Sequence, residues 1–249
     1  MTIRVFHRAV MRSGDTITLD AAESHYLARV RRARSGAAIE VLDGVAHAFT
    51  AEIVEADPSA ARVRIDAMIE RGEAPPIEIA IGLPDPSATL EAIARACELG
   101  AARAVLVRCE HSHAAEPGLE RTQRVIAAAQ RQCGRPDPIA VEGPLPLRDW
   151  LARPTAAAGF VACTELRGQP TTADAVGPDG ARVLVGPEGG LGREEIDLCI
   201  AHRLTPISLG PWTLRTEVAV VVALSLVIQG YGRAHGHGHG HGAGTGDAR

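Results

Sequence analysis

Two glycine-rich turns hold the residues whose types and spacing best suit ligand chemistry. The first, GPEGG at residues 186–190, follows an expected strand at 182–186 and precedes an expected helix at 193–203. A strand, a turn and a helix in succession form the usual geometry for binding a nucleotide-like ligand beyond the end of a strand. On local chemistry alone, an ordinary turn stiffened by Pro187 explains the segment equally well.

The charges of this first turn argue against a phosphate ligand. The turn lacks the GxGxxG spacing, contains Glu188, and is followed by Glu194 and Glu195 in the first turn of the helix. All three carboxylates would repel a pyrophosphate, and the last two already complement the helix N-terminus. A ligand with hydroxyl groups, an adenine ring and a positive charge fits these residues better.

The second turn, LGPWTLRTE at residues 209–217, repeats the Gly-Pro pair of the first turn after another expected strand. Two such turns at neighbouring strand ends can face each other across one pocket. Thr216 is expected to cap the helix at 217–229. Because this helix is apolar nearly all round, it must be buried in the core or against a second subunit.

Composition limits the chemistry further. All 26 basic residues are arginine, which excludes a P-loop lysine, a Schiff-base lysine and a lysine general base. Five singly placed cysteines fit neither a zinc site nor a disulfide framework, so we expect a cytoplasmic location. No signal peptide and no membrane span is expected, because the longest apolar run is shorter than the roughly 20 residues that cross a bilayer. His25, His111 and His113 lack further ligands at workable spacing, so no metal site is expected.

Periodicity divides the chain into two folded parts. Residues 1–70 alternate short β patterns with turns around one helix that opens at Asp20 and closes near Gly36, which indicates a small β-barrel-like domain. A polar, proline-rich linker at 71–76 leads to an α/β domain at 77–231. Its expected strands are 77–83, 104–109, 159–163, 182–186 and 206–209, and its expected helices are 87–99, 119–132, 193–203 and 217–229. Residues 232–249 are a Gly- and His-rich tail that is expected to be disordered.

Arginines gather in two places. Arg29, Arg31, Arg32 and Arg34 lie within six residues with no acid among them, and a second group comprises Arg121, Arg124, Arg131 and Arg135. A solvated helix face explains either group alone, but two groups favour RNA contacts despite the net charge of -4. Because aromatic residues are only 3% of the chain, recognition is expected to depend on arginine and shape.

The two turns taken together carry a specific family resemblance. GPEGG followed by LGPxxLRTE resembles the C-terminal signature of the SPOUT class of methyltransferases, and most closely the 16S ribosomal RNA uracil-N3 methyltransferases. HYLARVRR at 25–32, ELG at 98–100 and QCGR at 132–135 are similar to further motifs of that family, so the likeness covers roughly residues 3–230. It implies an N-terminal PUA-like β-barrel domain, a C-terminal SPOUT α/β domain tied in a trefoil knot, and a homodimer that binds S-adenosylmethionine in the knot.

The resemblance assigns roles to particular residues. It implies methylation of N3 of a uridine in 16S rRNA of the small subunit, with Arg215 stabilising charge on the uracil carbonyls and Glu217 orienting Arg215 or accepting the proton. A structural ion pair between those two is the alternative interpretation. The implied RNA-binding residues are Arg29, Arg31, Arg32, Arg34, Arg131 and Arg135. The implied cofactor-binding residues are Val185, Gly186, Pro187, Glu188, Gly189, Gly190, Leu209, Gly210, Pro211, Leu214 and Thr216.

The chain departs from the family pattern on the RNA side. Trp212 stands where the family commonly has arginine, and Arg131 stands where it usually has glutamate. Lysines that the family has near the first α/β helix are absent, with Ala88 and Arg95 in that neighbourhood. Two other functions therefore stay open: a ribose 2′-O-methyltransferase of the same class, and a non-catalytic RNA-binding or ribosome-assembly protein.

Overall fold

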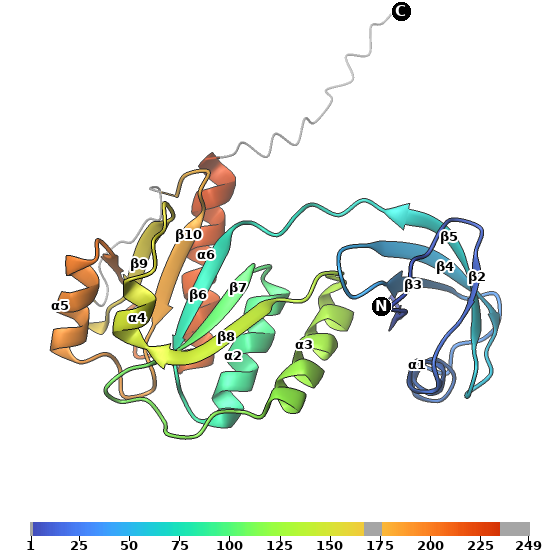
Figure 1. Cartoon of the computed structure of the whole chain (residues 1–249), viewed down its shortest axis with the longest axis horizontal. Coiled ribbons are helices and arrows are strands. Elements are labelled where there is room, and N and C mark those ends of the chain that lie inside the picture. The colour runs from blue at the N-terminus through green and yellow to red at the C-terminus, as the bar shows by residue number, and fades with distance from the viewer. Residues whose placement is uncertain (1, 167–175, 235–249) are drawn as a thin grey trace, which may run out of the picture.

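The computed structural model describes residues 2–166 and 176–234, and in this part of the chain two β-sheets are joined by an extended connection (Figure 1). The connection runs from the end of β5 to the start of β6, across the expected linker at 71–76. Residues 232–234, which were expected to begin the disordered tail, instead belong to the last helix, and the rest of the expected tail, from residue 235 onward, lies outside the described residues.

The N-terminal sheet has the strand order β1-β3-β4-β5-β2. Among the described strands of this sheet, β1 and β3 pair in parallel, and all other neighbouring strands pair antiparallel. Asp43 builds the turn between β3 and β4, because one of its carboxylate oxygens accepts three backbone N–H groups at 2.8–2.9 Å. The strands are Arg4–Phe6 (β1), Thr16–Thr18 (β2), Ala38–Leu42 (β3), Ala48–Glu55 (β4) and Arg62–Ile69 (β5).

The helix that carries the first arginine group is shorter than its pattern predicts. Asp20 caps α1 (Ala21–His25) by accepting the Glu23 N–H at 2.8 Å, and a π-helical turn, η1 (Tyr26–Val30), continues it. The expected helix to Gly36 ends at Val30 instead, because Arg32 adopts a left-handed conformation with φ of 52°. The arginines at 29–34 therefore span a helix end and a loop rather than one helix face.

The C-terminal sheet is parallel throughout its described strands, in the order β11-β9-β10-β6-β7-β8. Every residue of the central strand β10 is buried, as expected for a parallel strand covered on both faces. The strands are Ile77–Gly82 (β6), Arg103–Arg108 (β7), Ala140–Pro146 (β8), Ala158–Ala162 (β9), Ala181–Val185 (β10) and Thr205–Ile207 (β11).

Helices cover both faces of this sheet (Figure 1). One face packs against α2 (Pro86–Glu98), α3 (Leu119–Cys133) and α6 (Thr216–Ala234), and the other packs against α4 (Leu147–Leu151) and α5 (Arg193–Ala201). A short 3-10 turn, η2 (Thr164–Leu166), follows β9. The layers form the α/β architecture that the alternating pattern predicts.

The long apolar helix α6 belongs to the protein core. By length and composition it could cross a membrane. However, Val220, Ala223, Leu224 and Val227 are completely buried against the C-terminal sheet and α2. Val218, near its beginning, is 42% exposed. The helix therefore has one face in the core and an apolar strip at the surface.

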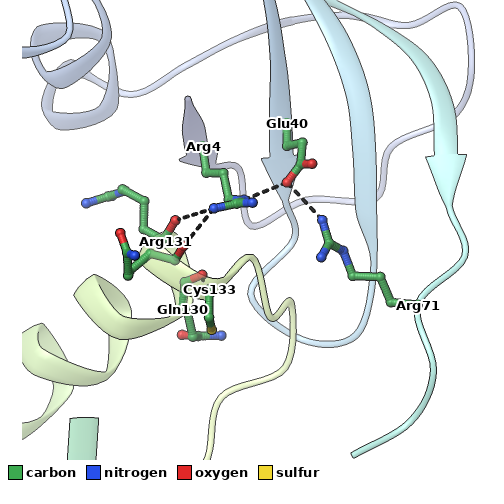
Figure 2. Close-up of polar contacts among 7 residues, drawn as sticks. Arg4, Glu40, Arg71, Gln130, Arg131 and Cys133 are labelled. Atoms are coloured by element: carbon green, nitrogen blue, oxygen red, sulfur yellow. Dashed lines mark hydrogen bonds and ion pairs between the residues drawn. The ribbon is translucent and has the colours of Figure 1, made fainter. Parts of the chain in front are cut away.

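Polar contacts join the N-terminal sheet to the end of α3 (Figure 2). Arg4 Nη1 donates to the carbonyl oxygens of Arg131 and Gln132 at 3.1 and 2.8 Å. The guanidinium also forms an ion pair with Glu40, at 2.6 Å, and Glu40 accepts a second hydrogen bond from Arg71 at 2.9 Å. Because Arg71 lies in the connection between the sheets, Arg4 and Glu40 together join the N-terminal sheet, the connection and the end of α3.

Candidate functional site

The two glycine-rich turns form one pocket at the carboxyl ends of β9, β10 and β11. The pocket has a volume of about 310 Å³. Its wall includes every residue of the implied cofactor set except Pro211, which is exposed beside it. Residues of the set that line the pocket are Val185, Gly186, Pro187, Glu188, Gly189, Gly190, Leu209, Gly210, Leu214 and Thr216.

A direct hydrogen bond links the two turns. Thr216 Oγ1 donates to the carbonyl oxygen of Gly186 at 3.3 Å, so the start of α6 is held against the end of β10. Within the first turn, the Gly190 N–H donates to the Pro187 carbonyl at 2.8 Å, and Gly190 has φ of 74°, which favours glycine. The turn is thus closed internally and attached to its neighbour.

Gly82, which lies outside both glycine-rich turns, is also required by a close approach of the backbone. Gly82 ends β6, and a Cβ atom there would lie 2.6 Å from Pro187 Cδ and 2.8 Å from Pro187 N. Such distances are well inside van der Waals contact. The GPEGG turn therefore lies directly on the end of β6, and only a residue without a side chain allows this.

The Glu195 carboxylate lies at the beginning of α5, where a helix N-terminus could otherwise bind an anion. Glu195 accepts the N–H groups of Gly192 at 2.9 Å and of Glu110 at 2.8 Å, which completes the beginning of α5. Because the helix N-terminus is already satisfied by a negative group, it offers little to an anionic ligand. The local chemistry agrees with the sequence argument for a ligand that is not a pyrophosphate.

Cysteine thiols near the site are poor nucleophiles. Burial, with a smaller contribution from the Glu195 carboxylate, raises the pKa of Cys109 and of Cys199 to about 12. Both thiols are therefore protonated near neutral pH, and nucleophilic attack requires the thiolate. In the described chain, no group of three potential metal ligands gathers either.

Arg215 and Glu217 flank the pocket without contacting each other. Arg215 is exposed and Glu217 half-buried, and no ion pair or side-chain hydrogen bond of either is found among the described residues. The alternative interpretation, a structural ion pair at the helix start, does not describe this structure. The Arg215 guanidinium is instead free to meet a substrate.

A third loop, residues 109–113, supports the first turn and was not predicted as part of the site. His111 packs on Gly189, where an added Cβ would lie 2.7 Å from the His111 Cβ, and His111 Nδ1 lies 3.4 Å from the Gly190 carbonyl oxygen. The position of this loop in the sequence could have identified it as part of the site. It follows the expected strand at 104–109, and the carboxyl ends of parallel strands lie at the same edge of a sheet. The residue types alone suggested His111 and His113 only as metal ligands.

The arginines differ in their surroundings. Arg29, Arg32 and Arg34 are exposed and Arg31 half-buried, and the described residues form no ion pair with any of the four. Arg131 forms an ion pair with Glu23 at 2.5 Å, and its guanidinium lies over the rings of Phe6 and Tyr26.

Arg135 is likewise engaged within the chain. It forms an ion pair with Asp137 at 2.6 Å and donates to the Ala101 carbonyl at 2.6 Å. Arg131 and Arg135 therefore hold the fold together, and the N-terminal group has its charges available.

Known proteins resemble most of the chain. A family of RNA methyltransferase domains matches residues 72–228, and a family of RNA methyltransferase PUA domains matches residues 19–66. Ribosomal RNA small subunit methyltransferase E of Synechocystis is 32% identical over 85% of this chain and 72% of its own length. The protein of the same name from Mycobacterium tuberculosis is 28% identical over 86% of this chain and 87% of its own.

A solved structure confirms the predicted fold. Ribosomal RNA small subunit methyltransferase E of Neisseria gonorrhoeae, bound to S-adenosyl methionine, superposes with a TM-score of 0.78 at 22% identity, over 93% of this chain and 98% of that one. The expected α/β domain with a smaller N-terminal PUA-like domain is thus confirmed. The chain belongs to the family of RNA methyltransferases that carry a PUA domain.

Proposed function

We propose that this protein uses S-adenosylmethionine to methylate N3 of a uridine in 16S rRNA of the small ribosomal subunit. The observation that carries the proposal is the single pocket formed by the two glycine-rich turns, with the unpaired Arg215 beside it. Relatives named ribosomal RNA small subunit methyltransferase E support the choice of RNA.

The pocket suits a cofactor with a positive charge and an adenosine moiety. Gly186, Gly189 and Gly190 have no side chain and line the wall with their main chain, and Glu188 supplies a negative charge within the wall. Residues 185–190, 209–210, 214 and 216 would hold the cofactor. When bound, S-adenosylmethionine would supply a methyl group that is already activated for transfer.

The protein must then position the uracil ring and help N3 lose its proton. Orientation of the nucleophile in line with the donor accounts for much of the rate in such reactions. Arg215 stabilises the negative charge that develops on the uracil carbonyls as the proton leaves. Glu217 accepts that proton in our scheme, because it is the carboxylate that follows Arg215 at the start of α6.

RNA contacts come from the N-terminal arginine group, at residues 29, 31, 32 and 34, whose charges are free to meet phosphates. We also propose a homodimer that uses one face of α6, where Val218 is exposed and Val222 and Leu226, one and two turns further along, are half-buried, because a partly exposed apolar strip favours a protein contact. The reaction takes place in the cytoplasm, where ribosomal RNA is found.

Mass spectrometry of ribosomal RNA nucleosides tests the proposal. Cells that lack this protein should lose one 3-methyluridine from 16S rRNA, and restoring the gene should return it. Loss of a ribose 2′-O-methyl nucleoside instead would identify the other methyltransferase of this class. An unchanged profile would overturn the proposal and favour a non-catalytic RNA-binding protein.

A further inference from the structure

Trp212 is an exposed indole at the rim of the cofactor pocket. It lines the pocket, yet 80% of its surface is accessible. The chain has only two tryptophans, and the other, Trp150, is fully buried with its Nε1 donating to Glu78 at 2.7 Å. Among the large apolar side chains that are exposed in the described residues, Trp212 is the one aromatic.

The loop that carries Trp212 is anchored on both sides. Leu209 and Leu214 pack against the core, and Thr216 is hydrogen-bonded to the first turn. Gly210 has φ of 130°, a conformation that favours glycine, and precedes Pro211 at the outward bend. Because both ends are fixed, the exposed position of the indole is built into the backbone.

We infer that Trp212 is a stacking platform for a nucleobase of the RNA substrate, at the mouth of the methyl-donor pocket. This inference rests on the proposed function. A base that reacts with an enzyme-bound donor must leave its own stack, which costs free energy. An aromatic face compensates for the lost stacking, and it does so for any base. The unpaired Arg215, three residues further along the chain, is then available for the carbonyl edge of the same ring.

Two other roles for Trp212 make different predictions. An indole that covers the cofactor would change the affinity for S-adenosylmethionine when it is removed. An indole in a subunit contact would change the oligomeric state. A base-stacking residue changes neither, and it affects only the binding and turnover of RNA.

Photo-crosslinking identifies the contact directly. The full-length protein is mixed with S-adenosylhomocysteine and a 16S rRNA transcript that carries 5-bromouridine in place of uridine, then irradiated and digested. We expect a crosslinked peptide in which Trp212 carries the nucleotide, and we expect the Trp212→Phe variant to crosslink at the same position. Crosslinks confined to other peptides would overturn the inference.

The kinetics of Trp212 variants distinguish aromatic stacking on a base from a merely apolar contact with it. Trp212→Ala and Trp212→Leu should lower kcat/KM for RNA by about 5- to 160-fold, the range that base–aromatic stacking supplies, while Trp212→Phe keeps most of the activity. Calorimetry should give an unchanged Kd for S-adenosylmethionine, and light scattering an unchanged oligomeric state. Val10→Ala, at an exposed apolar residue of the N-terminal domain, is the control and should behave as wild type.

The outcomes distinguish this inference from the proposed function. If wild-type protein methylates RNA and Trp212→Leu retains full activity, the inference is wrong and the proposed function stands. A loss of cofactor affinity or of the dimer in Trp212→Ala also overturns it. If wild-type protein methylates no RNA, the proposed function fails, and the inference fails with it.

Discussion

Arg215 and Arg131 are both arginines that the sequence assigned to RNA chemistry, but their surroundings are opposite. Arg131 has an ion-pair partner and two aromatic rings around its guanidinium. Arg215 is exposed beside the pocket with no acidic partner within ion-pair distance in the described chain. A guanidinium that is not already neutralised by a carboxylate interacts more strongly with charge that develops on a substrate.

Replacing Arg215 with alanine should therefore abolish most turnover and spare the cofactor site. We expect kcat to fall by about 100- to 1000-fold, the usual cost of removing one group that stabilises developing charge. The Kd for S-adenosylmethionine, measured by calorimetry, should stay within twofold. Arg103→Ala, at the start of β7 and so at the opposite end of the sheet from the pocket, is the matched control. An active Arg215→Ala enzyme would remove this residue from the mechanism.

At the scale of elements, the shape of the pocket depends on how closely the segments at the ends of β6, β7 and β10 approach one another. The end of β6 lies under the GPEGG turn at Gly82, the loop after β7 packs on Gly189 through His111, and the start of α6 bonds to Gly186. All of these contacts are between parts of the protein. They hold the main chain of the two turns in the arrangement that makes one pocket.

Gly82→Ala tests this dependence. The new methyl group would lie 2.6 Å from Pro187 Cδ and 2.8 Å from Pro187 N, so the turn must move. We expect at least about a tenfold weaker binding of S-adenosylmethionine, because a displacement of this kind changes the whole wall. Gly118→Ala is the control, since a Cβ there meets nothing within 4 Å and its φ is -65°. Equal affinities for both variants would contradict the role of the β6 contact.

At the scale of the whole molecule, the contact between Glu23 and Arg131 fixes how the arginine-bearing helix lies relative to the methyl-donor pocket. Glu23 is on α1, which continues into η1 and the arginine group, and Arg131 is on α3. Burial raises the pKa of Glu23 in spite of the Arg131 charge nearby. A buried pair of this kind contributes little net stability and is better understood as fixing an orientation.

A charge exchange tests that role. Arg131→Glu places two carboxylates together and should raise KM for small ribosomal subunits several-fold, without changing the Kd for S-adenosylmethionine. The double variant Glu23→Arg with Arg131→Glu should recover part of the loss, because the attraction returns while the contacts of the guanidinium with Phe6 and Tyr26 do not. Arg103→Glu, at the start of β7, controls for an added negative charge on the C-terminal part of the chain. If the double variant is no better than the single one, the ion pair does not set the orientation.

Local pattern was sufficient to predict the two turns and most of the C-terminal sheet. The expected strand at 182–186 differs by one residue from β10, and the two turns form one pocket as predicted. β8 was missed, because Gly143 and its neighbouring prolines give it no alternation, and a strand at the edge of a sheet tolerates these residues. The trefoil knot stays a prediction.

The amino-acid sequence by itself determined the fold class, the two turns and the chemistry that they favour, because these depend on residues close together in the chain. Only the tertiary structure decided which arginines are free, that His111 and Gly82 support the pocket, and that Trp212 stands exposed at its rim. Spacing along a helix shows which residues share a face. It does not show which residues from a distant part of the chain pack against that face. At Arg131 those residues supply a carboxylate and two aromatic rings.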